Sequence, residues 1–201
     1  MGGEARDGEP GIVPTEIVGD GESAGSVEQV APGDHILIVD DDGQSMLNSL
    51  KRVLRKPFPD AKLDTAEDGL EAITTVRLLV DDLRSRLLLV VSDTMMPRMT
   101  GIDLYEELRK IPGLEYLPFI LLSGGMPNEA VKQRFEQIAA SGDPFFRFLD
   151  KPFDPTELQR VAKELVELRA QRRAAQVNTA SDLTDEPGSD DESGSGIVPG
   201  V

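Results

Sequence analysis

The 201-residue chain has no cysteine, no tryptophan and only one histidine, His35. Without cysteine, the chain can form no disulfide bond, no zinc–thiolate site and no thiol nucleophile. The single histidine precedes the first apolar segment, where we expect a surface position, and one histidine gives no basis for an internal phosphohistidine relay. The chemistry of the chain must therefore be sought in its other polar residues.

Long apolar segments are also missing. No stretch approaches the roughly 20 apolar residues that span a bilayer, and the N-terminal sequence MGGEARDGEP has neither a basic start nor an apolar segment typical of a signal peptide. Arg6 disfavours N-myristoylation of the same segment. We therefore expect a cytoplasmic protein with no membrane partner.

Positive charge is scarce relative to negative charge. The formal net charge is -16, and the two ends, residues 1–33 and 177–201, carry -6 each, so that -4 remains for residues 34–176. Acidic ends repel a phosphate backbone. The charge distribution thus predicts no direct nucleic-acid partner.

Composition divides the chain into three parts. Residues 1–33 and 176–201 are rich in Gly, Glu, Asp, Pro and Ser, with few large apolar side chains, and are predicted to be disordered acidic tails. Residues 34–175 have the length and composition of one folded domain. Its last segment, DPTELQRVAKELVELRAQRRAA, predicts an extended helix with Asp154 as N-cap and Pro155 at the first helical position.

Within this domain, short apolar segments alternate with longer segments of helical period. The predicted strands are Ile36–Val39, Ala61–Thr65, Leu87–Val91, Phe119–Leu122 and Phe145–Leu149. The helices predicted between them are Gln44–Arg55, Gly69–Arg84, Ile102–Lys110 and Asn128–Ala140. Five strands that alternate with helices predict an α/β fold with a five-stranded parallel sheet, whose carboxyl ends share one edge.

Polar residues follow four of the five predicted strands. Asp40 and Asp41 follow the first, Asp93 the third, Ser123 the fourth and Lys151 the fifth. At one sheet edge, carboxylates without a nearby His or Cys favour Mg²⁺ or Mn²⁺, and a lysine and a hydroxyl suit a phosphoryl group. One aspartate could then act as a nucleophile and form an acyl phosphate, but residue types alone leave open which one.

These segments resemble the receiver domain of two-component response regulators. The matching stretches are ILIVDDD, DTAEDGLEA, LLLVVSDTMMPRMTG, PFILLSG and FLDKPF, which occur in the family's order over residues 35 to about 170. The resemblance implies a flavodoxin-like (βα)5 three-layer sandwich. It also implies a stand-alone response regulator, since too few residues follow the last helix to form a DNA-binding output domain.

The resemblance also implies the roles of the site residues. Asp93 would be the phosphoacceptor, and Asp40, Asp41, the Asp93 carboxylate and the backbone carbonyl of Met95 would bind the metal. Lys151 would pair with the phosphoryl group.

Two further residues would respond to phosphorylation. Ser123 would supply the switch hydroxyl, and Phe148 would be the aromatic side chain that moves with it. The implied phosphodonor is a histidine kinase or a histidine phosphotransfer protein. The product would signal by protein contacts, as a monomer or a weak phosphorylation-dependent homodimer, and not act as a dedicated enzyme.

Two alternatives remain. ILIVDDDGQS also resembles the first motif of haloacid dehalogenase-like phosphatases, with Asp40 as nucleophile and Asp42 as acid/base, and Ser123 and Lys151 could stand for later motifs. That family's acidic pair after the lysine is missing, however. The other alternative is a receiver-like interaction module that takes no phosphate.

The position of Asp42 distinguishes the receiver hypothesis from the phosphatase hypothesis. In a receiver, we expect Asp42 to cap or begin the helix predicted over Gly43–Leu54, where the helix dipole favours an acid. A phosphatase requires Asp42 in the site instead.

Overall fold

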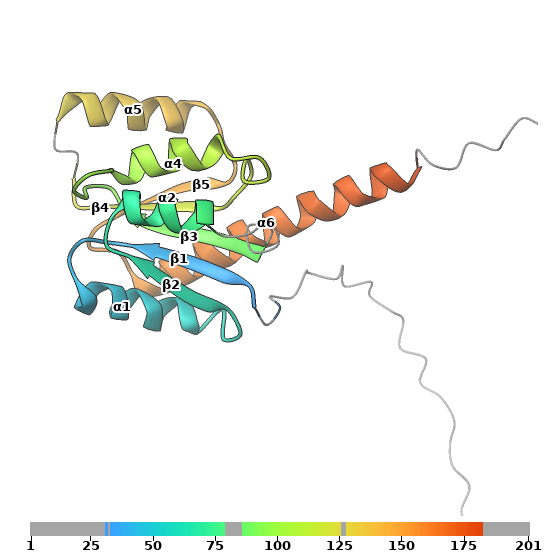
Figure 1. The fold of residues 1–201 in the computed structure, drawn as a ribbon, viewed down its shortest axis with the longest axis horizontal. Helices are drawn as coiled ribbons and strands as arrows, with labels where there is room; N and C mark the ends of the chain where they lie inside the picture. The colour runs from blue at the N-terminus through green and yellow to red at the C-terminus, as the bar shows by residue number, and fades with distance from the viewer. Residues whose placement is uncertain (1–30, 32, 79–85, 126–127, 183–201) are drawn as a thin grey trace, which may run out of the picture.

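The computed structural model describes residues 31, 33–78, 86–125 and 128–182. Five parallel strands form a single sheet in the order β2-β1-β3-β4-β5 (Figure 1). Their bounds are β1 His35–Val39, β2 Lys62–Ala66, β3 Leu87–Asp93, β4 Phe119–Ser123 and β5 Phe146–Asp150. This confirms the predicted five-stranded α/β fold, with each strand shifted by at most two residues from its expected bounds.

Helices cover both faces of the sheet. Figure 1 shows α1 and α6 on one face and α2, α4 and α5 on the other. The helices are α1 Gln44–Arg55, α2 Gly69–Leu78, α4 Gly101–Arg109, α5 Glu129–Ala140 and α6 Pro155–Asp182. None of these described helices is both long and apolar enough to cross a bilayer.

The alternating directions of strand side chains explain why there are two cores. In β1, Ile36 and Ile38 join the cluster under α1 and α6, whereas Leu37 and Val39 join the cluster under α2, α4 and α5. A strand covered on both faces is apolar at nearly every position. Every residue of β3 is accordingly buried.

The helix predictions are mostly confirmed. The bounds of α1 are as predicted, and Asp154 accepts a hydrogen bond from the Thr156 amide at the start of α6. The second predicted helix is described only to Leu78, because residues 79–85 lie outside the described part, as do residues 1–30. Helix α6 continues to Asp182, seven residues beyond the helix end predicted at residue 175, since adding a residue to a formed helix costs far less than nucleating one.

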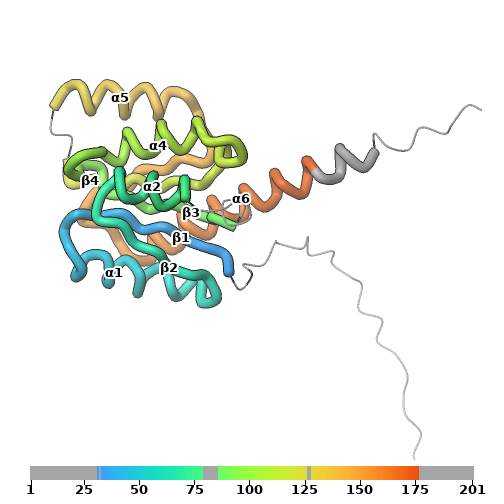
Figure 2. Tube along the Cα trace, viewed as in Figure 1, coloured from blue at the N-terminus to red at the C-terminus, as the bar shows by residue number. Residues whose placement is uncertain are grey.

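Strand register brings the polar residues together at the carboxyl edge. Val39 pairs with Ser92, so Asp40 follows β1 beside the end of β3, where Asp93 lies. Ser123 pairs with Asp150, and the Lys151 amide donates to the Ser123 carbonyl oxygen at 2.6 Å. At the opposite edge, the chain enters β1 and α6 extends beyond the sheet (Figure 2).

Candidate functional site

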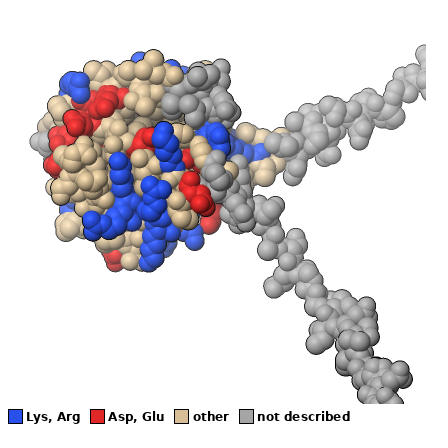
Figure 3. All heavy atoms as spheres, turned by 60° about the horizontal axis from the view of Figure 1, so that its bottom comes forward, with Lys and Arg blue, Asp and Glu red and all other residues tan. Residues whose placement is uncertain are grey.

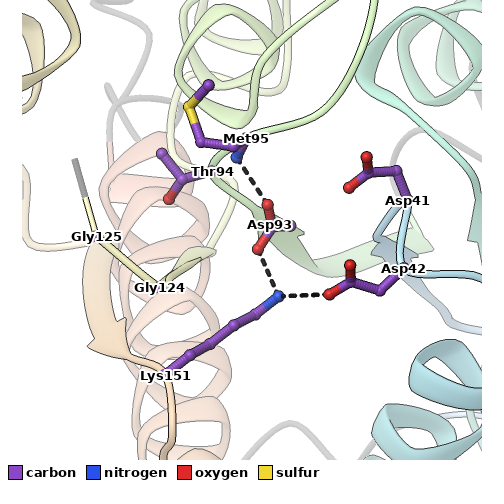
Figure 4. A pocket seen from close by; sticks show the side chains of 8 residues that line it. All are labelled: Asp41, Asp42, Asp93, Thr94, Met95, Gly124, Gly125 and Lys151. Atoms are coloured by element: carbon purple, nitrogen blue, oxygen red, sulfur yellow. Dashed lines mark hydrogen bonds and ion pairs between the residues drawn. The ribbon is translucent and has the colours of Figure 1, made fainter. Parts of the chain in front are cut away.

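A pocket of about 540 Å³ opens at the carboxyl edge of the sheet. Figure 4 shows residues from the carboxyl ends of β1, β3, β4 and β5 around it. The lining residues are Asp41, Asp42, Asp93, Thr94, Met95, Gly124, Gly125 and Lys151. The four chain segments that the sequence predicts to meet at this edge of the sheet therefore do meet there.

Asp93, the last residue of β3, is buried yet lines this pocket. Its Oδ1 lies 2.5 Å from the Lys151 ammonium, and its Oδ2 accepts a hydrogen bond of 2.7 Å from the Met95 amide (Figure 4). Both oxygens are thus held in fixed directions. The carboxylate is oriented at the floor of the pocket, where a reacting group can reach it.

Lys151 connects the carboxylates. Its Nζ lies 3.1 Å from Asp40 Oδ2 and 3.5 Å from Asp42 Oδ2, in addition to its contact with Asp93. Burial opposes the positive charge, but the hydrogen bond to Asp93 and the charges of Asp40 and Asp93 outweigh it and raise the pKa of Lys151. The lysine is therefore cationic at neutral pH.

Asp40 lies deeper than the pocket and has no exposed surface. Its Oδ1 accepts from the Asp42 amide at 2.9 Å, and its Oδ2 faces Lys151. Burial raises the pKa of the Asp40 carboxyl, and the nearby Asp93 adds to the increase, while the Asp42 hydrogen bond and Lys151 lower it in part. A carboxylate that is costly to keep charged is well placed to gain from an additional cation.

Asp42 contradicts the expected helix-capping role. Gly43, and not Asp42, occupies the N-cap position directly before α1, with a φ of 85°. No side chain caps the start of this helix. The Asp42 amide bonds back to Asp40, and the Asp42 side chain lies at the pocket, 3.5 Å from the Lys151 ammonium (Figure 4). One requirement of the phosphatase hypothesis is thus met.

The donor set suits a hard divalent cation. Asp40, Asp41 and Asp42 each offer a carboxylate oxygen, and these oxygens lie within 4.8 Å of one another. Of the four carboxylates at the site, those of Asp40, Asp42 and Asp93 lie within 4 Å of the Lys151 ammonium. No His or Cys lines the pocket, so an all-oxygen site favours Mg²⁺ or Mn²⁺ over zinc or copper.

Ser123 and Phe148 lie near the site but not in it. Ser123 is buried and does not line the pocket; its hydroxyl donates to the Gly125 carbonyl oxygen at 2.9 Å and accepts from the Gly125 amide at 3.1 Å. Phe148 is half-buried and packs on Phe135 of α5, with ring centroids 4.6 Å apart. Ser123 thus holds the loop after β4, and Phe148 packs against α5.

Thr94 is a pocket residue that sequence reasoning missed. Its amide and its hydroxyl both donate to the Leu122 carbonyl oxygen, at 2.8 and 2.7 Å. These bonds fix the chain directly after Asp93 against the end of β4. Only its position next to a strand-end aspartate could have indicated this role.

Gly101 explains the spacing of the segment SDTMMPRMTG. The Gly101 amide donates to the Thr94 carbonyl oxygen, and a Cβ at Gly101 would overlap the Asp93 carbonyl oxygen. Thr100 caps α4 reciprocally with Asp103. The loop after Asp93 therefore returns so closely that only glycine fits where α4 begins.

Comparisons with known proteins agree with this geometry. The family model described as response regulator receiver domain matches residues 36–163. The chain is 34% identical over 105 residues to a probable transcriptional regulator, ycf29, of Porphyra purpurea, and the match covers 52% of this chain and 44% of that protein. It is 28% identical over 144 residues to the two-component response regulator ARR17 of Arabidopsis thaliana, with 68% and 87% covered.

Solved structures give the same result. A two component transcriptional regulator AraC from Clostridium phytofermentans superimposes with a TM-score of 0.53 at 26% identity, covering 71% of this chain and 98% of that one. The signal receiver domain of a histidine kinase from Syntrophus aciditrophicus gives 0.52 at 26% identity, with 66% and 89% covered. The chain spans less than half the length of the Porphyra relative.

Proposed function

The chain belongs to the response regulator receiver domain family of two-component signalling, and from this premise we propose that Asp93 accepts a phosphoryl group from phosphohistidine. The donor is a histidine kinase or a histidine phosphotransfer protein. One observation carries the choice of Asp93: it is the buried strand-end carboxylate that also lines the pocket, held by Lys151 and by the Met95 amide.

The transfer is a substitution at phosphorus. A carboxylate oxygen of Asp93 forms the new P–O bond, the P–N bond of phosphohistidine breaks, and its electron pair returns to the imidazole nitrogen, which takes a proton from water. Lys151 neutralises the oxygens of the transferred group. Because Lys151 already lies against Asp93, it needs no large movement to do so.

We assign the metal site to Asp40, Asp41, Asp93 and the backbone carbonyl of Met95, with Mg²⁺ as the cofactor and Mn²⁺ as a substitute. When bound, the ion would supply positive charge to the phosphoryl oxygens. Asp40 orients Lys151, and the exposed Asp41 is free to act as a ligand.

The switch is assigned to Ser123 and Phe148. A phosphoryl group on Asp93 adds negative charge and acceptor oxygens. The Ser123 hydroxyl then exchanges the Gly125 carbonyl for a phosphoryl oxygen, which shifts the Gly124–Gly125 loop and the start of α5. Phe148 follows, because it packs on Phe135 of α5.

The output is a change in protein contacts, made by a monomer or a weak phosphorylation-dependent homodimer. The chain assists its own phosphorylation and dephosphorylation and is not a dedicated enzyme. The proposed partners are proteins, and not nucleic acid or a membrane. The proposed location is the cytoplasm.

The family match favours the receiver over the phosphatase alternative, although Asp42 lies where the phosphatase hypothesis requires it. Its nucleophile, Asp40, has no exposed surface and does not line the pocket. The non-phosphorylated module remains as a competing hypothesis, which an experiment must decide.

Intact-mass measurement tests the proposal. With Mg²⁺ and acetyl phosphate, the chain should gain the mass of one phosphoryl group, whereas Asp93→Asn, or the wild type with EDTA, should gain none. A wild-type chain that stays unmodified, while a known receiver domain is phosphorylated in the same mixture, would support the inert module.

A further inference from the structure

The outer surface of α1 is basic although the chain as a whole is strongly acidic. Helix α1 contains no Asp or Glu, and residues 44–62 carry five basic residues and one acid. Figure 3 shows Lys and Arg side chains gathered side by side on the face of the molecule that α1 helps to form. The net charge of this segment is thus opposite in sign to that of the whole chain.

A groove runs between the end of α1 and the first half of α6. Its volume is about 640 Å³, and its lining residues are Lys56, Pro57, Thr156, Gln159, Arg160, Lys163, Glu164 and Glu167. Arg160 pairs with Glu164 at 3.0 Å, but Lys56 and Lys163 are exposed and make no ion pair within 4 Å with any described residue. The two ammonium groups are thus available to an acidic segment.

We propose that the acidic segment 185–192 of this same chain binds in the groove between α1 and α6. The segment DEPGSDDE contains five acids and no base, and it follows α6, one wall of the groove. Opposite charges steer the segment toward the groove, and covalent attachment keeps its effective concentration high. The inference does not depend on phosphorylation of Asp93.

The length of the chain fits this path. Asp182 lies 19 residues beyond Lys163 on α6, which at 1.5 Å per residue is about 28 Å. An extended chain rises about 3.3 Å per residue, so about nine residues cover that distance when the chain runs back along α6. The residues that then reach Lys163 are Asp190, Asp191 and Glu192.

Zero-length cross-linking of the full chain tests the proposal. A carbodiimide joins a carboxylate to a lysine amine with loss of water, and only where the two groups touch. At low ionic strength, peptide mass spectrometry should find Lys56 or Lys163 joined to Asp190, Asp191 or Glu192. In an equal mixture of normal and heavy-nitrogen protein, the joined peptides should both be normal or both be heavy, because the contact is within one chain.

Salt and matched variants sharpen the test. At about 1 M salt, where screening acts within about 3 Å, these cross-links should be lost. Replacing Asp190, Asp191 and Glu192 by Asn, Asn and Gln should also remove them. The same change at Asp20, Glu22 and Glu28, which neutralises three acids near the other end, should leave them intact.

The pair Glu107–Lys110, at 2.7 Å, provides the internal positive control. If that pair cross-links but Lys56 and Lys163 do not, the proposal is wrong. It is equally wrong if these lysines join to acids among residues 4–28, or if the joined peptides mix normal and heavy nitrogen, because another segment or a second copy then occupies the groove.

Discussion

Gly101 tolerates no side chain, because the carboxyl end of β3 packs directly against its Cα. A Cβ there would overlap the Asp93 carbonyl oxygen and lie 2.7 Å from the Leu121 side chain. Backbone atoms of a buried strand cannot move aside cheaply. Gly101→Ala should therefore lower the free energy of unfolding by about 1–3 kcal/mol, measured by urea denaturation.

Gly124→Ala is the matched control. A Cβ at Gly124 meets no atom within 4 Å, and its φ is not in the left-handed region. Its free energy of unfolding should stay within about 0.5 kcal/mol of the wild type. If the two variants were equally stable, the close approach at Gly101 would not be a constraint.

Asp42 adds a negative charge at the mouth of the pocket without being the nucleophile. One unit charge about 4 Å away is worth about 1 kcal/mol in water, or about fivefold in rate. Asp42→Asn should thus still be phosphorylated at Asp93, and up to about fivefold faster by the anionic donor acetyl phosphate. The matched control is Asp60→Asn, which removes the same charge from an exposed loop residue outside the site. Its phosphorylation rate should equal that of the wild type. Loss of phosphorylation in Asp42→Asn would contradict the account.

For single residues, the sequence predicts the position of a site residue that ends a strand. It does not predict the position of a site residue that a loop places. Asp93 and Lys151 could be found because parallel strands deliver their carboxyl ends to one edge. The position of Asp42 could not, because it depends on the positive φ of Gly43 and on a backbone bond to Asp40. Thr94 was missed for a similar reason, since its role is a hydrogen bond to the neighbouring strand.

Asp143 ties α4 to the loop that precedes β5. Its Oδ2 accepts from the Tyr105 hydroxyl at 2.7 Å and from Arg109 at 2.9 Å. Burial raises the pKa of Asp143, but the bonds to Tyr105, Arg109 and the Phe145 amide outweigh it, and the pKa lies below 3.8. Burial and the bond to Asp143 also raise the pKa of Tyr105 to about 12.

The pH dependence follows from this lowered pKa. A carboxylate with a depressed folded-state pKa stabilises the fold above its unfolded pKa, and the stabilisation disappears as the pH falls through the folded pKa. At pH 7, Asp143→Asn should therefore lower the free energy of unfolding by about 1–3 kcal/mol. The difference from the wild type should shrink below pH 3.8. A difference that does not change with pH would show that the charge of Asp143 is not what stabilises this junction.

Elements were predicted well wherever an amphipathic period marks them. Helix α1 has the expected bounds because its apolar residues repeat at helical spacing between polar ones. The end of α6 was placed too early, at residue 175, because composition alone does not show that a formed helix continues into a polar segment. The two edge strands, β2 and β5, are each shifted by one residue from their predicted bounds.

Binding of a divalent cation should stabilise the whole molecule. The site holds four carboxylates and one ammonium, which contacts three of them, and a ligand that binds only the folded chain adds stability by mass action. Mg²⁺ at about 100 times its dissociation constant should raise the free energy of unfolding by about 2.7 kcal/mol, measured with and without EDTA. In Asp41→Asn the increase should be much smaller at the same concentration. An equal increase in both proteins would place the ion elsewhere.

The order of the motifs predicted the whole fold and the meeting of the site segments, because right-handed crossovers leave a single sheet edge for all five strand ends. The surface outside the site was less predictable. The groove between α1 and α6 is lined by Lys56 and Lys163, which are distant in sequence, and the packing of α1 on α6 places both on it.

Localising the acyl phosphate tests the central claim most directly. After incubation with Mg²⁺ and acetyl phosphate, borohydride reduces an aspartyl phosphate and marks its position for peptide mass spectrometry. The account predicts the mark on Asp93 alone. A mark on Asp40, or no mark on a chain handled beside a receiver domain that is labelled, would contradict it.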